Sequence, residues 1–306
     1  ADGRVVRPLS LEGLEDVARD LLTRGVRAAA VALMHSYRNA EHEERVAAFL
    51  RDMGFETVAA SASLAPLIKI LPRAQTAVVE ACLGPIIDGY LTRVGACVTG
   101  SVHAMTSAGG LVEATRYHAK DSLLSGPAAG VAGAAVSGGR SGEGRIISFD
   151  MGGTSTDVAR WDGDFEYQFE HTVGDARLVA PAMAIETVAA GGGSICRFTE
   201  GRLTVGPESA GADPGPACYG AGGPLTVTDV NLLLGRLDPD RFGIPIAVDA
   251  AQSRLHELLT EMPNKTPAEQ VLSGLAQIAD ERMAAAIRRV SLEKGYDPGV
   301  HALVAF

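Results

Sequence analysis

The chain has 306 residues, of which 46% are hydrophobic and 21% charged, as is typical of a soluble globular protein of about two domains. Its formal net charge of −10 argues against nucleic acid or an anionic membrane as a main partner, because both attract clustered positive charge. A local anion site remains compatible with this charge, since backbone N–H groups bind phosphate without lysine or arginine.

The four cysteines, Cys82, Cys97, Cys196 and Cys218, lie far apart and form no C-x-x-C pair. This spacing favours free thiols in a reducing compartment over a disulfide framework. The sequence shows neither a signal peptide nor an apolar run that we judge long enough to span a bilayer. We therefore expect a cytoplasmic protein.

Both ends of the sequence look internal to a longer polypeptide. The chain begins at Ala1 rather than at a methionine, and it ends in HALVAF, an apolar run typical of a buried strand. A core strand is an unusual place for a natural terminus. We expect the 306 residues to be a fragment of a longer polypeptide.

Residues 5–107 alternate between helical and strand patterns. Ser10 is a candidate cap for the first helix, and a second helix is expected from Asn39 to Met53. Strands separated by helices predict a parallel sheet with helices on both faces. The other expected elements here are helices 11–22 and 73–94 and strands 27–34, 56–61 and 101–107.

A second region begins near residue 122. Its first helix carries small residues that permit close approach to another backbone, and the three strands that follow read as an antiparallel meander. Residues 174–226 are rich in Gly and Pro, with a hairpin at Glu200-Gly201, and a loop region of this length is usually functional. The expected elements are helices 125–136, 228–236, 249–261 and 267–294 and strands 145–150, 156–161 and 165–171.

The segment SFDMGGTSTDVARWDG (148–163) has the composition of a phosphate cradle between two strands. Gly152 and Gly153 allow a ligand to approach the backbone closely. Hydroxyl and N–H groups that can bond phosphate oxygens follow at once. An ordinary polar hairpin turn is the alternative. The hydroxyl-bearing residues are Thr154, Ser155 and Thr156.

Two acids flank these glycines and hydroxyls. Asp150 stands at the end of the first strand, where it can hold hydrated Mg²⁺, a cation that often takes one or two carboxylates plus phosphate oxygens. Asp157 can brace the loop by a hydrogen bond across it.

The octapeptide DMGGTSTD (150–157) resembles the second phosphate loop of the actin-like ATPase superfamily. More narrowly, the chain resembles the hydantoinase A / 5-oxoprolinase / acetone carboxylase β-subunit family, with matching segments in the same order and at similar spacing. These segments are SGPAAGVAGA (125–134), SFDMGGTSTDVA (148–159), AGGGSI (190–195), VGPESAGADPGPACYG (205–220), TVTDVNLLLGRLDPDRF (226–242) and MAAAIRRVSLEKGYDP (283–298).

The resemblance implies an α/β protein with the actin-like ATPase (ribonuclease H-like) two-domain fold, truncated at both ends. Residues 1–121 would be the remainder of the first actin-like domain, without its N-terminal phosphate-loop hairpin. Residues 122–306 would be the second domain, with the phosphate loop at 148–163 and a Gly/Pro-rich insertion at 174–226. ATP in such folds lies between the two domains, each of which supplies one phosphate loop.

The implied function is that of part of an ATP-dependent hydrolase subunit for cyclic amides of the hydantoin or 5-oxoproline type. ATP with Mg²⁺ would activate a carbonyl oxygen, and a B-type subunit, hydantoinase B-like, would be the partner. The chain alone is expected to bind nucleotide weakly and to be inactive. The alternatives are an acetone carboxylase-type subunit, a small-molecule kinase on the same fold, and a non-catalytic nucleotide-binding module.

The expected site combines the residues above with two later segments. The glycines of AGGGS either line a phosphate or form a flexible connector. Asp229 either contacts nucleotide or is an ordinary acid at the positive end of a helix, and Asp213 is either a ligand or a turn residue. The expected catalytic residues are Asp150, also the metal ligand, and Asp157; those for the cofactor are Gly152, Gly153, Thr154, Ser155, Thr156, Gly191, Gly192, Gly193 and Asp229.

Three positions depart from the family pattern. Ala108 replaces an amide residue in SAGGL, Pro72 precedes Arg73, and Glu80 stands where Asn is common. They indicate a different substrate or a divergent subfamily. Arg73 is either a site residue or a solvated charge at a helix end. No histidine pair has metal-ligand spacing, so we expect no zinc site.

Overall fold

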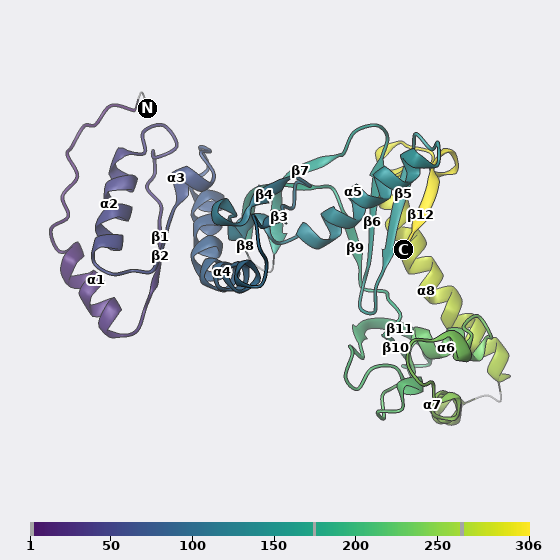
Figure 1. Cartoon of the computed structure of the whole chain (residues 1–306). Helices are drawn as coiled ribbons and strands as arrows, with labels where there is room; N and C mark the ends of the chain where they lie inside the picture. The colour runs from purple at the N-terminus through teal and green to yellow at the C-terminus, as the bar shows by residue number, and fades with distance from the viewer. Residues whose placement is uncertain (1–2, 174–175, 264–265) are drawn as a thin grey trace. The chain divides into compact units, whose positions relative to one another are not determined.

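The computed structural model describes residues 3–173, 176–263 and 266–306 (Figure 1). Contacts between residues divide the chain into two compact units. Unit 1 runs to Ala129 and includes Tyr167–Met183; unit 2 comprises Gly130–Glu166 and Ala184–Phe306. Residues 167–183, which we expected in the second domain, thus pack with unit 1. The assignment of residues 1–121 and 122–306 to two nucleotide-binding domains stays a prediction.

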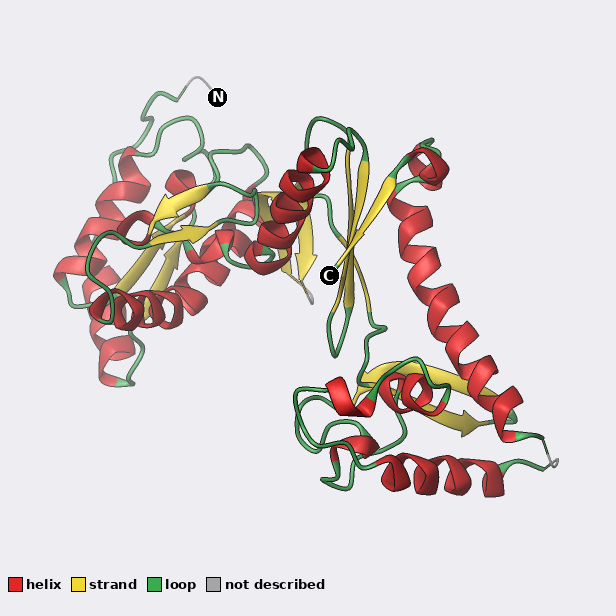
Figure 2. Cartoon of the chain, turned by 45° about the vertical axis from the view of Figure 1, so that its right-hand side comes forward, coloured by secondary structure: helices red, strands yellow, loops and turns green. Residues whose placement is uncertain are grey.

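Figure 2 shows the helices and strands of the chain, and most of them lie within a few residues of their expected positions. The helices are α1 (Leu14–Thr23), α2 (Glu41–Asp52), α3 (Ser61–Leu64), α4 (Ile70–Ala96), α5 (Ser125–Arg140), α6 (Val227–Leu233), α7 (Val248–Glu261) and α8 (Ala268–Val290). The strands are β1 (Ala28–Val31), β2 (Thr57–Ala60), β3 (His103–Met105), β4 (Leu111–Glu113), β5 (Ile146–Met151), β6 (Thr156–Trp161), β7 (Tyr167–Val173), β8 (Ala176–Met183), β9 (Glu186–Val188), β10 (Ser194–Thr199), β11 (Arg202–Ser209) and β12 (Ala302–Ala305).

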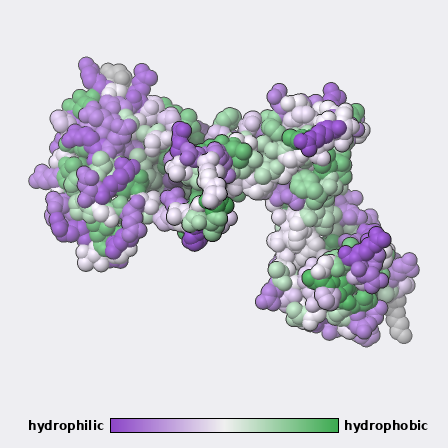
Figure 3. Space-filling view, viewed as in Figure 1, coloured by the Kyte–Doolittle hydropathy of each residue, from purple (hydrophilic) through white to green (hydrophobic). Residues whose placement is uncertain are grey.

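Unit 1 is built on the parallel pair β1–β2, which confirms the parallel arrangement expected for these two strands. The apolar sides of α1 and α2 close over this pair, while hydrophilic residues gather on their outer surface (Figure 3). Helix α4 packs against β1, β2 and β8. The core formed with α1 and α2 contains Ala18, Val31, Ala47, Leu50, Phe55 and Ala60.

Two expectations for unit 1 are wrong. Strand β3 does not join the parallel sheet but pairs antiparallel with β4, because Gly109, with a φ of 80°, turns the chain straight back. Ser10 does not cap α1 either: the N-cap is Gly13, and the Ser10 hydroxyl instead accepts the N–H of Glu12.

Helix α4 also corrects the expectation that no segment is apolar enough to cross a membrane. Among the described residues, α4 alone has the length and composition to do so. This is a weak indication, because core helices of globular proteins pass the same test. Here α4 lies against strands of unit 1 and carries Arg73, whose side chain is fully buried.

Unit 2 contains a four-stranded sheet of order β12-β5-β6-β9, in which β12 runs parallel to β5. Successive β5 side chains point to opposite faces: Ile146 packs beneath Ala134 and Ala135 of α5, and Ile147 packs against α8. Gly138 allows α5 to approach the sheet closely, since a Cβ at this position would lie only 2.6 Å from the Ile146 side chain. The sheet is therefore covered by one helix on each face.

The expected meander of 145–171 is only partly correct. Strands β5 and β6 form the hairpin, but β7 pairs with β8, and the neighbour of β6 is β9. Strand β12 is also less buried than expected, since Leu303 is 57% exposed.

The rest of unit 2 packs around the N-terminal half of α8 (Figure 2). The hairpin β10–β11 turns at Glu200 and Gly201, both at positive φ, which confirms the hairpin expected there. Helix α8 contributes to two separate cores, one with this hairpin, α6 and α7 and one with the sheet.

In unit 1, Glu80 of α4 ties the helix to the segment around η2 (Ala119–Asp121). Its carboxylate lies 3.1 Å from Nδ1 of His118 and accepts the N–H of Lys120 at 2.7 Å. The hydrogen bond with Glu80 raises the pKa of His118 despite partial burial. For Glu80, burial raises the pKa, but the bonds from His118 and Lys120 outweigh it and the net pKa is lowered.

We expect the His118→Ala substitution to cost more stability at about pH 5.5 than at about pH 8.5. Because the folded pKa of His118 is raised, its stabilisation is complete below the unfolded pKa and is lost as pH rises through the folded pKa. Urea unfolding at both pH values measures the difference. In a Glu80→Gln background the histidine substitution should cost the same at both pH values; a persisting dependence would assign the effect to another partner.

Candidate functional site

The loop between β5 and β6 is exposed and presents unused donors. The N–H of Gly152 donates to the carbonyl of Ser155 at 3.0 Å and closes the turn. Gly152, Gly153 and Thr154 are exposed. Within the described part of the chain, the N–H groups of Gly153, Thr154 and Ser155 have no hydrogen-bond partner. Three successive free amides of this kind can receive an anion.

Asp150 and Asp157 face each other as a cross-strand pair at the base of this loop. Burial and the negative charge of Asp157 raise the pKa of Asp150. Asp157 is held differently from the expectation: its carboxylate accepts the hydroxyl of Thr187 on β9 at 2.5 Å, so it braces the neighbouring strand rather than the loop.

The acidic pair fits a magnesium ion only through water and a ligand. No cluster of three or more His, Cys, Asp or Glu that can hold a metal occurs among the described residues. Mg²⁺ commonly keeps several waters and takes one or two carboxylates with phosphate oxygens. Asp150, half-exposed beside the free amides and without a hydrogen-bond partner in the described ranges, meets that requirement.

Thr156 is placed beneath the loop rather than on its open side. Its side chain is fully buried, and its hydroxyl donates to the carbonyl of Ala190 at 2.6 Å. It therefore joins β6 to the glycine segment that follows β9, whereas the hydroxyls of Thr154 and Ser155 remain available to a ligand.

The glycine segment 191–193 lies directly behind the loop. Its amides are not free: Gly191 donates to the Ser194 hydroxyl at 2.9 Å, Gly192 to the Gly152 carbonyl at 3.0 Å and Gly193 to the Gly153 carbonyl at 2.6 Å. A Cβ at Gly191 or Gly193 would lie less than 3.0 Å from that loop backbone. The segment thus supports the loop, and of these two described segments the loop is the one that presents free amides.

Asp229 is fully buried at the start of α6. Its carboxylate accepts the Thr226 N–H while the Thr226 side chain accepts the Asp229 N–H, and these two bonds form a capping box. The carboxylate also accepts the Thr226 hydroxyl and the N–H groups of Ala217 and Cys218. These four donors occupy the carboxylate, so the geometry favours its role as a helix-start acid. Asp213 is exposed.

Arg73 of α4 is not a solvated charge at a helix end, and it does not lie in the β5–β6 loop. It is fully buried in unit 1, 3.5 Å from the Glu43 carboxylate, and it donates to the hydroxyls of Ser36 and Ser61. It also donates to the carbonyls of Leu33 at 2.7 Å and Leu67 at 3.0 Å. Sequence reasoning missed its partner Glu43; the alternative of a solvated helix-end charge is wrong.

The cysteines are free thiols, as expected. Cys82 and Cys97 are exposed, while Cys196 and Cys218 are buried. Burial, and then the Asp229 charge, raise the pKa of Cys196 to about 12. Such a thiol stays neutral and is a poor nucleophile or metal ligand.

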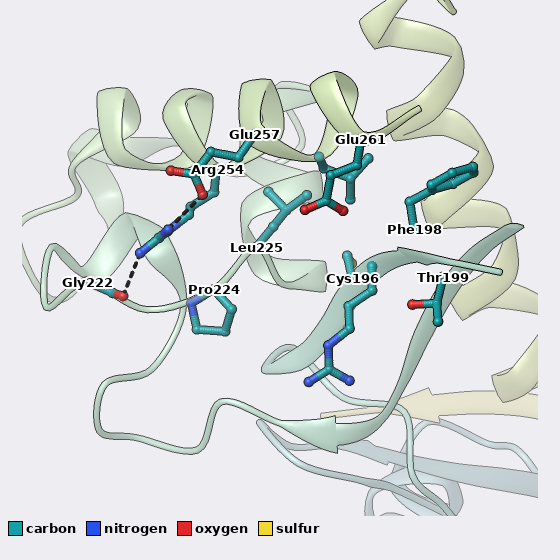
Figure 4. A pocket seen from close by; sticks show the side chains of 11 residues that line it. Cys196, Phe198, Thr199, Gly222, Pro224, Leu225, Arg254, Glu257 and Glu261 are labelled. Carbon is teal, nitrogen blue, oxygen red and sulfur yellow. Dashed lines mark hydrogen bonds and ion pairs between the residues drawn. The ribbon is translucent and has the colours of Figure 1, made fainter. Parts of the chain in front are cut away.

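A cavity of about 520 Å³ lies between β10, residues 222–225 and α7 (Figure 4). Both guanidinium groups that line it are already engaged. Arg254 donates to the carbonyls of Gly222 and Gly223 and pairs with Glu257 at 2.7 Å, and Arg197 pairs with Glu208 at 2.7 Å. None of the lining residues belongs to the loop, so this cavity is not assigned to the site.

Family models match most of the chain. The hydantoinase/oxoprolinase model matches residues 73–306, and the model of the hydantoinase/oxoprolinase N-terminal region matches residues 1–54. A 5-oxoprolinase of Pestalotiopsis fici is 41% identical over 99% of this chain and 25% of its own length. The caprolactamase subunit alpha of Pseudomonas jessenii is 33% identical over 99% of this chain and 46% of its own length.

Solved structures of similar proteins agree with these sequence matches. ATP-dependent caprolactamase from Pseudomonas jessenii superposes with a TM-score of 0.82 and 32% identity over 100% of this chain and 46% of that one. Nucleotide-free acetone carboxylase gives 0.80 and 26% over 97% and 44%. Both have the actin-like ATPase fold, which confirms the expected fold class. The chain spans between about a quarter and a half of the length of these proteins. It belongs to the hydantoinase/oxoprolinase family.

Proposed function

We propose that this chain supplies one of the two phosphate-binding loops of an enzyme that uses ATP to hydrolyse a cyclic amide. The observation that carries the proposal is the exposed turn of three free amides beside the Asp150–Asp157 pair. The relatives support it, since they include proteins described as 5-oxoprolinase and as ATP-dependent caprolactamase.

In this proposal the loop residues hold and orient the phosphates. The N–H groups of Gly153, Thr154 and Ser155 donate to phosphate oxygens, and the free hydroxyls of Thr154 and Ser155 add further donors. For phosphoryl transfer such positioning and charge stabilisation are the main contributions of a protein. ATP would thereby activate the amide carbonyl oxygen.

Asp150 would hold Mg²⁺ through its carboxylate and bound water, with Asp157 alongside. The ion would supply neutralisation of phosphate charge. Asp157 keeps β6 and β9 in register through Thr187, so it supports the position of Asp150 on the adjacent strand.

The partner of this chain would be a B-type subunit that is hydantoinase B-like. The enzyme would be located in the cytoplasm. The name of the caprolactamase relative, a subunit alpha, supports a multi-subunit enzyme. An acetone carboxylase-type activity is the second candidate, favoured by the TM-score of 0.80 to that enzyme.

The test measures phosphate release from Mg-ATP by the whole protein, with and without its B-type subunit and with 5-oxoproline, hydantoin or caprolactam. Amide-dependent ATP hydrolysis with ring-opened product is expected. Turnover only with acetone and bicarbonate would transfer the assignment to a carboxylase. Release of a phosphorylated substrate would indicate a kinase, and nucleotide binding without any turnover a sensing module.

A further inference from the structure

The glycine segment holds two peptide units of the loop by their carbonyl ends. The carbonyl of Gly152 accepts from Gly192 at 3.0 Å, and that of Gly153 accepts from Gly193 at 2.6 Å. Both peptide bonds are trans. In a trans peptide the C=O and N–H point in opposite directions, so holding the carbonyl fixes the direction of the N–H. The bonds therefore aim the free N–H groups of Gly153 and Thr154.

Thr228, near the start of α6, holds the glycine segment in the same way that the glycine segment holds the loop. Its N–H and its hydroxyl both donate to the Gly192 carbonyl, at 2.8 Å and 2.9 Å. That carbonyl belongs to the same peptide unit as the N–H of Gly193, which in turn holds Gly153. A continuous row of hydrogen bonds runs from Thr228 to the Thr154 N–H, and bonds in such a row polarise one another.

The row of hydrogen bonds begins at a well-held helix start and is closely packed at Gly192. The capping box and the bonds that Asp229 accepts from the N–H groups of Ala217 and Cys218 hold the first turn of α6. At Gly192 a Cβ would lie 2.8 Å from the Thr228 hydroxyl. The space between the helix start and the glycine segment therefore does not admit a side chain at Gly192.

We propose that Thr228 is a positioning residue for the phosphate loop: through the Gly192 carbonyl and the Gly193 N–H it aligns the peptide unit whose N–H, that of Thr154, binds phosphate. The role of that N–H group rests on the proposed function. The alignment of the loop by Thr228 does not, because it is a property of the protein without ligand.

The test compares Thr228→Val, which removes the hydroxyl but keeps the shape and the N–H, with Thr228→Ser, which restores the hydroxyl. Hydrogen–deuterium exchange of the whole protein is followed in peptides covering 190–194 and 152–156. Loss of one hydrogen bond is expected to speed amide exchange at Gly192 and Gly193 about fivefold in the valine variant. The serine variant should match the wild type.

The second readout is the KM for ATP, which should rise about fivefold in Thr228→Val and return in Thr228→Ser, with the KM for the amide unchanged. The control is Thr204→Val on β11, which removes a threonine hydroxyl that donates to Arg197 instead. It should alter neither measurement.

Unchanged exchange in Thr228→Val, or equal exchange in the valine and serine variants, would overturn the positioning role. If the wild type binds no nucleotide, the proposed function fails, and the exchange comparison still decides the role of Thr228. Faster exchange with an unaltered KM for ATP would leave the alignment by Thr228 in place but would overturn the phosphate-binding role of the amide that it aligns.

Discussion

The Asp150→Asn variant is expected to lose ATP turnover by about a thousandfold while remaining folded. The amide keeps the size of the side chain but removes the charge that would hold hydrated Mg²⁺ at the loop. Burial and Asp157 already disfavour the charged form of Asp150, so the neutral side chain should leave the thermal midpoint unchanged or raise it. Phosphate release and thermal unfolding measure the two effects.

The matched control is Asp162→Asn, in the turn after β6. Asp162 pairs with the exposed Arg145 at 3.1 Å and with the buried Arg160 at 3.2 Å, so its loss removes two ion pairs from the same hairpin. Turnover should stay near the wild-type value. Near-wild-type turnover of Asp150→Asn would remove Asp150 from the metal role. If the thermal midpoint of Asp150→Asn collapses instead, the variant says nothing about chemistry. The turnover of Asp150→Glu then decides the role of Asp150.

The Arg73→Met variant is expected to lose about 3–5 kcal/mol of unfolding free energy. The substitution leaves the Glu43 carboxylate buried without its counter-charge and deprives the carbonyls of Leu33 and Leu67 of a donor. Urea unfolding of the chain, followed by circular dichroism, measures the loss.

Two further variants make this result specific. Arg93→Met, on an exposed position of the same helix, should change stability by less than about 0.5 kcal/mol. The double substitution Arg73→Met with Glu43→Gln should recover part of the loss, because no net charge then stays buried. A cost below about 1 kcal/mol for Arg73→Met would mean that water reaches Glu43.

Local patterns predicted the β5–β6 hairpin and its glycine turn well, because β5, these glycines and β6 are adjacent in the sequence. The hairpin at Glu200-Gly201 was predictable for the same reason. By contrast, the partner of Arg73 is Glu43, and the partner of Gly192 is Thr228, 36 residues away. No periodicity reveals such pairs.

The sequence errors have physical causes. The run 101–107 resembles a parallel strand, but the Gly109 turn offers it an immediate antiparallel partner in β4, which costs less chain entropy to form. Strand β7 resembles a continuation of the meander, yet β9 takes the place beside β6. The glycines 191–193 suggested exposed amides, and only the fold shows that the loop carbonyls use two of them.

The double use of α8 has a consequence for how unit 2 comes apart. A helix of 23 residues is about 34 Å long, and its two halves seal different cores. If either core opens, the stripe of the helix that it covered meets water, and fraying from that end weakens the other core. Melting should therefore spread along α8, so that the hairpin β10–β11 and the sheet that carries the loop lose structure in one cooperative step.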